Sequence, residues 1–245
     1  MRPFQVPDSR IQRAYRVRVS LFLLGVILVT TAMAIGYQGI YTLRVLDSVE
    51  RSRNHWQQPA EIIDQLKVKD GSIVADIGSG VGYFTLKIAP IVGKRGGVFA
   101  VDILKEPLGV LWIRALLRHQ SNIHIIHGEL DNPDLPEGRI DAVLIANSYH
   151  EFLHPRTILN HVLHALRRGG RIVVVDRGPL PAEEPSGGLI EGHHEVPSSA
   201  VEKDLRDTGY DLVTSNQRFI DVPAAERHED RPDNHRWWII VARKP

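Results

Sequence analysis

The sequence predicts an α/β fold with a doubly wound, mostly parallel sheet, preceded by one N-terminal transmembrane helix. Apolar runs without polar alternation, such as Ile73 to Ile77 and Ile140 to Ala146, alternate with segments of helical periodicity. That order is typical of parallel strands covered by helices on both faces. A glycine-rich loop follows the first run, and a long uncharged stretch precedes the whole pattern.

The composition excludes several classes of protein. The 245 residues are 43% hydrophobic and 24% charged, which is ordinary for a globular chain that buries a core. The formal net charge of +1 argues against a nucleic-acid-binding protein, which would carry a basic surplus. With no cysteine, the chain has neither a disulfide scaffold nor a thiolate metal ligand nor a cysteine nucleophile.

The uncharged stretch runs from Val19 to Leu43 and is long enough to cross a bilayer as a helix. Tyr37 and Tyr41 lie where interfacial aromatic residues belong, which favours a transmembrane anchor. A cleaved signal peptide is an alternative, since the triplet from Ala32 to Ala34 fits a cleavage site, and a buried core helix is another. We therefore divide the chain into a basic segment (1–18), an anchor or signal peptide (19–43), a linker or helix (44–58) and one domain (59–245).

The side of the membrane on which the domain lies is ambiguous. More arginines precede the stretch than follow it, and this bias places the N-terminus inside and the domain outside. The ligand inferred below is a cytoplasmic one and favours the opposite orientation. We expect a single-pass membrane protein whose domain faces the cytoplasm.

The domain reads as one series of alternating elements with no internal repeat. The expected strands are 73–77, 98–101, 123–126, 140–146, 172–175, 211–220 and 236–242. The expected helices are 59–67, 83–90, 108–117, 156–168 (stopped by Gly169-Gly170) and 199–207. Ligands of such sheets bind beyond the carboxyl ends of the strands, so the loops at that edge are expected to carry the function.

The loop after the first strand, within VADIGSGVGYF, is the most informative segment. Glycines at positions 78, 80 and 82 allow a tight turn and a close approach to a ligand. The dinucleotide fingerprint would need glycine at position 83, which is Tyr83, and a P-loop would need Gly-Lys-Ser/Thr. An acid, Asp76, opens the loop and would repel a pyrophosphate, so it suits a ligand with positive groups.

From about Pro59 onward, the chain resembles the Rossmann-like class I S-adenosylmethionine-dependent methyltransferases, and within them the methyltransferase type 11 group. The segments that carry the likeness are VADIGSGVG, VFAVDI, HGELDNPDLPEG, DAVLIANSYHEF and ALRRGGRIVVVD, in the family's order. The third departs from the family's commonest form, Gly-Asp-Ala.

The resemblance implies a set of cofactor-binding residues. Asp76 and the glycine loop would hold the methionine part of S-adenosyl-L-methionine, Asp102 both ribose hydroxyls, and Glu129-Leu130 the adenine. The full implied set is Asp76, Gly78, Ser79, Gly80, Gly82, Tyr83, Asp102, Ile103, Glu129, Leu130 and Asn147.

The histidines allow different interpretations. The segment from His150 to His154 matches the zinc protease pattern H-E-x-x-H, but it begins where a strand ends and Pro155 interrupts a continuous helix, so we expect no metal site. His150 and Glu151 are instead candidate catalytic residues, since histidine titrates near neutral pH and suits proton transfer. Alternatively, His150 has no catalytic role and only hydrogen-bonds a neighbouring loop.

The segment His193-His194-Glu195, between Pro179 and Pro197, is a candidate substrate lid.

The resemblance implies a membrane-tethered methyltransferase that acts on an unidentified acceptor, either small or membrane-associated. Its other partner would be the lipid bilayer, through the N-terminal helix. The alternative is a non-catalytic binding module, membrane-anchored or exported, that retains the fold, because fold alone does not prove chemistry.

Overall fold

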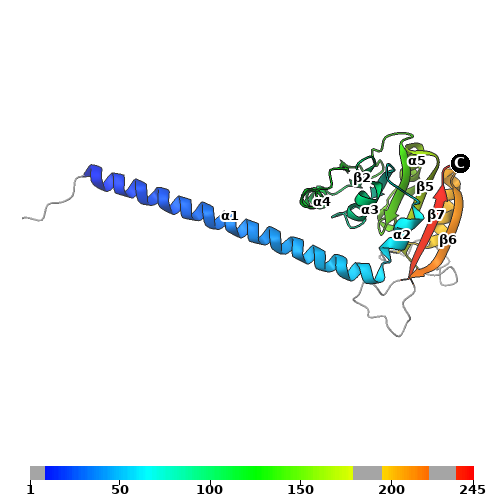
Figure 1. Ribbon diagram of the computed structural model, residues 1–245, viewed down its shortest axis with the longest axis horizontal. Coiled ribbons are helices and arrows are strands. Elements are labelled where there is room, and N and C mark those ends of the chain that lie inside the picture. Colours follow the sequence, from blue (N-terminus) through cyan, green and yellow to red (C-terminus); the bar gives the residue numbers. More distant parts are fainter. Residues whose placement is uncertain (1–8, 179–194, 221–235) are drawn as a thin grey trace, which may run out of the picture. The chain divides into compact units, whose positions relative to one another are not determined.

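The computed structural model describes residues 9–178, 195–220 and 236–245 of the chain. The chain divides into two compact units, Met1–Arg53 and Asn54–Pro245. Figure 1 shows a long helix in the first unit and an α/β domain in the second.

Helix α1 (Ser9–Trp56) supplies the described part of the first unit. Its portion from Leu21 to Trp56 contains an 18-residue window with a mean hydropathy of 1.9, which is long and apolar enough to cross a membrane, although a signal sequence shares these properties. Leu21 and Phe22 are 63% and 71% exposed. The segment 44–58 is helical as far as Trp56, because it contains neither glycine nor proline.

The second unit is built on a seven-stranded sheet, which confirms the predicted α/β class. Its order is β3-β2-β1-β4-β5-β7-β6; the first five strands are parallel, and β7 is antiparallel to both of its neighbours. The strands are β1 (Ile73–Ile77), β2 (Gly97–Asp102), β3 (Ile123–His127), β4 (Ile140–Ala146), β5 (Leu166–Arg177), β6 (Asp211–Ile220) and β7 (Trp237–Arg243). The chain reverses its direction of winding between β1 and β4, which is where such sheets bind ligands.

Helices cover both faces of the sheet. They are α2 (Pro59–Gln65), α3 (Thr85–Val92), α4 (Lys105–Leu117), α5 (Pro155–Ala165) and α6 (Ser198–Thr208), with a 3₁₀ turn η1 (Tyr149–Glu151) after β4. Side chains of β5 alternate between the two layers: Ile172 belongs to the cluster that contains residues of α5 and α6, and Val173 to the cluster that contains residues of α2 and α3. Both are fully buried, as expected for a strand with helices on each side.

The boundary between α5 and β5 differs from the prediction. The helix ends at Ala165, not at Arg168, and the strand begins at Leu166. Leu166 is fully buried and pairs with Ile140 of β4, so tertiary packing ends the helix before the glycines do. Gly169 has a φ of 73°, which glycine adopts easily, and it lies where the register between β4 and β5 shifts.

Two glycines of the loop after β1 serve different purposes. Gly82 has a φ of 90°, and a Cβ there would lie 2.2 Å from Leu111 Cδ1, so the loop packs directly against α4. Gly80 has a φ of 53°, but a Cβ there would meet no atom within 4 Å. Gly82 is therefore required for packing, whereas Gly80 leaves open space beside the loop.

We expect Gly82→Ala to lower the free energy of unfolding by about 2–4 kcal/mol, from overpacking against Leu111 added to left-handed strain. Gly80→Ala is the matched control and should cost only the strain, about 1 kcal/mol. Urea unfolding of the full chain in detergent measures both. Equal losses would contradict the packing role of Gly82.

Candidate functional site

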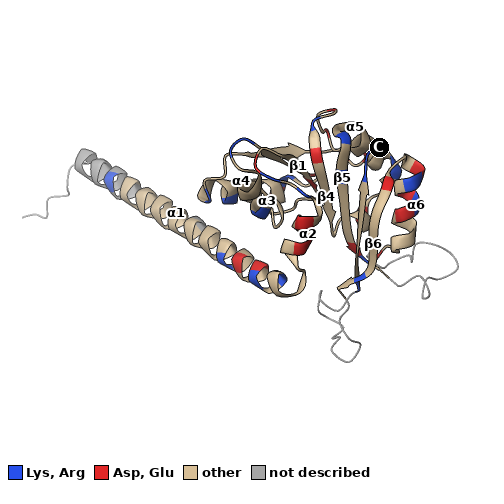
Figure 2. Ribbon diagram, turned by 45° about the vertical axis from the view of Figure 1, so that its right-hand side comes forward, with Lys and Arg blue, Asp and Glu red and all other residues tan. Residues whose placement is uncertain are grey.

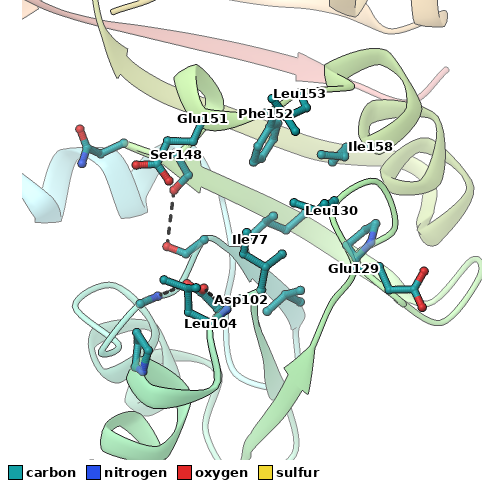
Figure 3. Close-up of a pocket in the computed structure, with 17 residues that line it drawn as sticks. Ile77, Asp102, Leu104, Glu129, Leu130, Ser148, Glu151, Phe152, Leu153 and Ile158 are labelled. Atoms are coloured by element: carbon teal, nitrogen blue, oxygen red, sulfur yellow. Dashed lines mark hydrogen bonds between the residues drawn. The ribbon is translucent and has the colours of Figure 1, made fainter. Parts of the chain in front are cut away.

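A cavity of about 270 Å³ opens at the carboxyl ends of the parallel strands. Its walls come from the segments that follow β1, β2, β3 and β4, together with the start of α4 and Ile158 of α5 (Figure 3). Eight of the sequence-predicted site residues line it: Gly78, Gly80, Asp102, Ile103, Glu129, Leu130, Asn147 and Glu151. Separate segments of the chain thus meet at the edge that the sheet topology indicates.

Asp102 joins the glycine loop to the end of β2. Its Oδ2 accepts a hydrogen bond from the Gly80 amide at 2.8 Å, and its Oδ1 accepts one from the Leu104 amide at 2.9 Å. The amides of Gly78 and Ser79 also donate to the Val101 carbonyl, at 2.9 and 3.0 Å. The half-buried carboxylate is therefore held in one orientation at the cavity wall (Figure 3).

Gly78 allows the loops after β1 and β4 to approach each other. A Cβ at this position would lie 2.1 Å from the Ser148 hydroxyl oxygen. That hydroxyl donates to the Ala146 carbonyl at 3.2 Å and lies 3.5 Å from the Gly78 carbonyl. Ser148 lines the cavity and was not predicted; nothing local marks it, because its role depends on contact with Gly78 in the loop after β1.

Two polar atoms near the cavity lack a hydrogen-bond partner within the described part of the protein. They are the Asn147 side-chain oxygen and the Ser79 hydroxyl. Asn147 also has a φ of 58°, an uncommon conformation for a residue other than glycine. Buried polar atoms normally have partners, so these two are available for a bound polar ligand.

One side of the cavity is apolar. Phe152 and Leu153 follow η1, and they lie with Leu130, Ile77 and Ile158 along this wall (Figure 3). Figure 3 shows the Glu129 carboxylate directed away from Leu130 and Ile77. Phe152 and Leu153 were not predicted, although both follow Glu151 directly; their direction depends on η1, which the sequence pattern does not predict.

Four of the predicted cofactor residues do not line the cavity. Asp76 is 2% exposed and accepts a hydrogen bond of 2.6 Å from the Thr85 hydroxyl. Tyr83 is buried and donates to the Asn54 side-chain oxygen at 2.9 Å. Ser79 and Gly82 belong to the same loop but do not line the cavity, and Gly82 packs against Leu111. Direct cofactor contacts by these four residues stay predictions.

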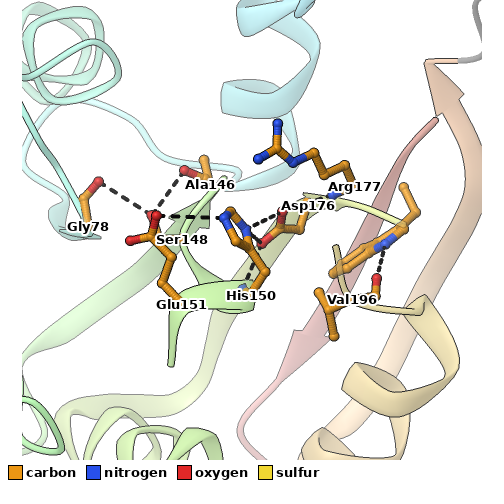
Figure 4. A network of polar contacts seen from close by, with 9 residues as sticks. Gly78, Ala146, Ser148, His150, Glu151, Asp176, Arg177 and Val196 are labelled. Carbon is orange, nitrogen blue, oxygen red and sulfur yellow. Dashed lines mark hydrogen bonds and ion pairs between the residues drawn. The ribbon is translucent and has the colours of Figure 1, made fainter. Parts of the chain in front are cut away.

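His150 lies behind the cavity and is bonded to a buried carboxylate. Its Nδ1 is 2.9 and 3.0 Å from the two Asp176 oxygens, and its amide donates to Asp176 Oδ2 at 3.1 Å (Figure 4). The imidazole is 2% exposed and the Asp176 side chain 0%. Because an ionised carboxylate only accepts hydrogen bonds, Asp176 fixes the proton on Nδ1.

The other imidazole nitrogen faces Glu151. His150 Nε2 lies 3.6 Å from Glu151 Oε1, and the Glu151 side chain is 67% exposed and lines the cavity. Asp176, His150 and Glu151 therefore form a series that runs from the end of β5 to the cavity (Figure 4). With Nδ1 directed at Asp176, Nε2 is the imidazole nitrogen on the side of Glu151 and the cavity.

Tyr149 attaches η1 to α6. Its hydroxyl donates to Asp204 Oδ2 at 3.0 Å, and Arg156 Nε donates to Asp204 Oδ1 at 2.7 Å. Burial, followed by the neighbouring Asp204 carboxylate, raises the pKa of the Tyr149 hydroxyl above its ordinary value. The hydroxyl stays protonated at neutral pH and keeps donating, which holds the turn that carries His150 and Glu151.

The described residues contain no group of three or more histidine, cysteine or acidic side chains that could hold a metal ion. His150 lies on η1 and His154 at the N-cap of α5, so the two histidines of the zinc pattern do not share one helix. The candidate lid lies mostly outside the described residues; only Glu195 and the two residues after it are described.

The domain has a Rossmann-like fold of the class I methyltransferase type, as its sheet order shows. Its cavity, built from a glycine loop and an acid at the end of β2, lies where such folds bind ligands that contain a nucleoside. Comparison with protein families agrees with this class. Residues 74–170 match the family described as Methyltransferase domain. This segment therefore matches a methyltransferase domain, and the second unit has the Rossmann-like fold of class I S-adenosylmethionine-dependent methyltransferases.

Curated relatives share this segment. The chain is 25% identical over 131 residues to demethylmenaquinone methyltransferase of Geobacillus sp. (strain WCH70), covering 54% of this chain and 56% of that protein. It is 32% identical over 110 residues to the ubiquinone/menaquinone biosynthesis C-methyltransferase UbiE of Ectopseudomonas mendocina (strain ymp), covering 44% and 43%. The chain therefore spans about half the length of these relatives.

Solved structures share the fold. Geranyl diphosphate C-methyltransferase from Streptomyces coelicolor A3(2), in complex with Mg²⁺, geranyl diphosphate and S-adenosyl-L-homocysteine, superposes with a TM-score of 0.65 at 15% identity. The match covers 77% of this chain and 80% of that one. At this identity the similarity establishes the fold alone.

Proposed function

We propose that this protein transfers the methyl group of S-adenosyl-L-methionine to a carbon of a small, largely apolar acceptor, at the surface of a membrane to which α1 tethers it. The cavity carries this proposal, because it combines a polar wall, formed by the glycine loop and Asp102, with an apolar wall that includes Phe152 and Leu153. A site for one polar ligand alone would not need the second wall.

The residues present fit the cofactor. Asp102 is a fixed, half-buried acceptor at the cavity wall, suited to the two hydroxyls of a ribose. Gly80 leaves open space for a close ligand, and the unpartnered Asn147 oxygen is an acceptor for an amino group. When bound, S-adenosyl-L-methionine supplies an electrophilic methyl group on a positively charged sulfur.

The acceptor class follows from the cavity and from the relatives. Two curated relatives are named as methyltransferases of menaquinone or ubiquinone biosynthesis, and the structural relative acts on geranyl diphosphate. Such acceptors combine a reactive carbon with apolar surface, which Phe152, Leu153 and Ile158 would cover. A quinone-like ring or a prenyl chain therefore fits better than a polar peptide or nucleic acid.

Methylation of carbon requires a proton to leave that carbon. Glu151 lines the cavity and lies next to His150 Nε2, so the pair can take up this proton. Asp176 stabilises the positive charge that the imidazole gains. The apolar wall excludes water and holds the acceptor carbon, which contributes through proximity and orientation.

Tethering by α1 is supported by its length, its hydropathy and the absence of charge from Val19 to Leu43. A signal sequence has the same features near an N-terminus. We favour the anchor because an apolar acceptor resides in the bilayer, and we favour a domain on the cytoplasmic side because the methyl donor is made there.

The first prediction of the proposed function concerns Asp102. Asp102→Ala removes a charge-assisted acceptor and should weaken binding of S-adenosyl-L-homocysteine by about 1.5–3 kcal/mol, roughly 10- to 150-fold. Titration calorimetry on the full chain in detergent measures the affinity. Asp131→Ala, an exposed acid outside the cavity lining, is the control and should bind normally. Unchanged affinity in Asp102→Ala would refute the ribose assignment.

The second prediction tests methyl transfer itself. The wild-type chain should move a labelled methyl group from S-adenosyl-L-methionine to demethylmenaquinol with a short prenyl chain. His150→Ala and Glu151→Gln should lower turnover roughly 10²-fold with nearly unchanged binding of S-adenosyl-L-homocysteine.

His154→Ala is the control for this assay, because His154 is exposed and makes no side-chain cap hydrogen bond, so its activity should be near normal. If His150→Ala loses cofactor binding or fails to fold, His150 has only a structural role. Binding of S-adenosyl-L-homocysteine without transfer to any acceptor, in the wild type, would favour the non-catalytic binding module instead.

The third prediction concerns the membrane. The full chain should stay in the membrane pellet after alkaline extraction, since an apolar helix spanning the bilayer is not released by loss of charge interactions. The domain should be protected from protease added to intact cells and cleaved in inverted vesicles. Release into the soluble fraction contradicts the anchor, and cleavage in intact cells contradicts the orientation.

A further inference from the structure

The exposed large hydrophobic residues of the described domain are concentrated in one region. They belong either to the rim of the cavity or to the outer face of α4, with only Ile91 and Val213 elsewhere. The rim members are Ile103 (47% exposed), Leu104 (55%), Leu130 (59%) and Leu153 (69%). Single exposed apolar residues are ordinary, but a contiguous group marks an interaction surface.

Helix α4 continues this region away from the cavity. Trp112, Ile113, Leu116 and Leu117 are exposed by 57%, 46%, 55% and 62%. Ile113, Leu116 and Leu117 lie on the side away from Leu108 and Leu111, which face the core, and Trp112 lies at the edge of that outer side. A helix that is apolar on both sides is normally covered on both.

The cavity rim and the α4 face are connected through the first residues of the helix. Leu104 is the N-cap of α4 and also lines the cavity, as does Pro107 in the first turn (Figure 3). Figure 2 shows charged residues of both signs along α6, whereas the exposed α4 residues named above are uncharged. Lys105 and Arg118 stand at the two ends of α4 beside one exposed acid, Glu106, so a net positive charge borders the apolar residues.

We propose that the outer face of α4 and the apolar cavity rim dock together on an anionic lipid surface, so that the cavity opens toward the bilayer. Trp112 and the leucines would enter the boundary between headgroups and acyl chains, and Lys105 and Arg118 would contact lipid phosphates. This arrangement rests on the proposed tether, which supplies the membrane. It would let an apolar acceptor enter the cavity without crossing water.

Lipid accounts for this surface better than a second copy of the chain does. An interfacial helix needs an aromatic or aliphatic face and basic residues at its borders, and α4 has both. The surface also surrounds the cavity mouth, so an isologous dimer through it would cover the entrance for the acceptor.

The test uses the full chain in nanodiscs that hold one copy each, made of phosphatidylcholine and phosphatidylglycerol with brominated or ordinary acyl chains. Bromine quenches tryptophan only on contact. The fluorescence contributed by Trp112, obtained as the difference between wild type and Trp112→Phe, should fall by roughly half in brominated discs. The subtraction removes the contributions of Trp56, Trp237 and Trp238.

A double variant, Leu116→Glu with Leu117→Glu, should abolish the quenching of Trp112 and leave the unfolding midpoint unchanged, because both side chains are more than half exposed. Val213→Glu, at an exposed apolar site on β6, is the matched control and should keep the quenching.

Trp112 fluorescence that is equal in the two kinds of disc would overturn the docking while leaving the tether intact. Quenching that persists in the double variant would equally overturn it. A chain that does not enter the discs contradicts the tether and, with it, this proposal. Neither measurement depends on methyl transfer, so the enzymatic proposal stands or fails separately.

Discussion

The hydrogen bonds of the Asp102 carboxylate are the interaction on which the cavity depends. One oxygen holds the glycine loop after β1 and the other holds the first turn before α4, so a single side chain sets the distance between two walls. A carboxylate that accepts two backbone amides is fixed more firmly than an exposed one, and its bonds are stronger than those between neutral groups. Because β1 and β2 are parallel neighbours, this bond lies at the edge where their loops begin.

The cavity wall formed by the loop after β4 depends on a steric constraint. The Ser148 hydroxyl occupies the space that a side chain at position 78 would fill, so the loop after β4 closes on the cavity only if position 78 is glycine. From there, η1 directs Glu151 and Phe152 into the cavity and His150 toward Asp176. The Tyr149–Asp204 bond holds the same turn from the other side. Packing on two sides therefore determines where the polar and apolar groups point.

Much of this domain could be predicted from the sequence, because the signals lie within short contiguous segments. Buried parallel strands read as short apolar runs, and the glycine loop and Asp102 belong to contiguous motifs, so the sheet class and the polar wall follow from the order of segments. The end of α5 was predicted three residues too late, because the burial of Leu166 against β4 is not visible in local periodicity. The continuation of α1 to Trp56 depends only on the lack of a helix breaker, a weak signal.

The parts that could not be predicted depend on contacts between distant segments. Asp176 ends the strand that follows α5, and only the pairing of β5 with β4 brings its carboxylate to His150. The residue type does not predict the burial of Asp176, because an acid at the end of a strand is ordinarily exposed. Here the side chain is completely buried. A buried carboxylate requires donors, and it obtains them from the His150 ring, the His150 amide and the Arg177 amide. The same bonds that satisfy this charge orient the imidazole toward Glu151, so the burial of Asp176 and the geometry of the proposed proton acceptor have one cause.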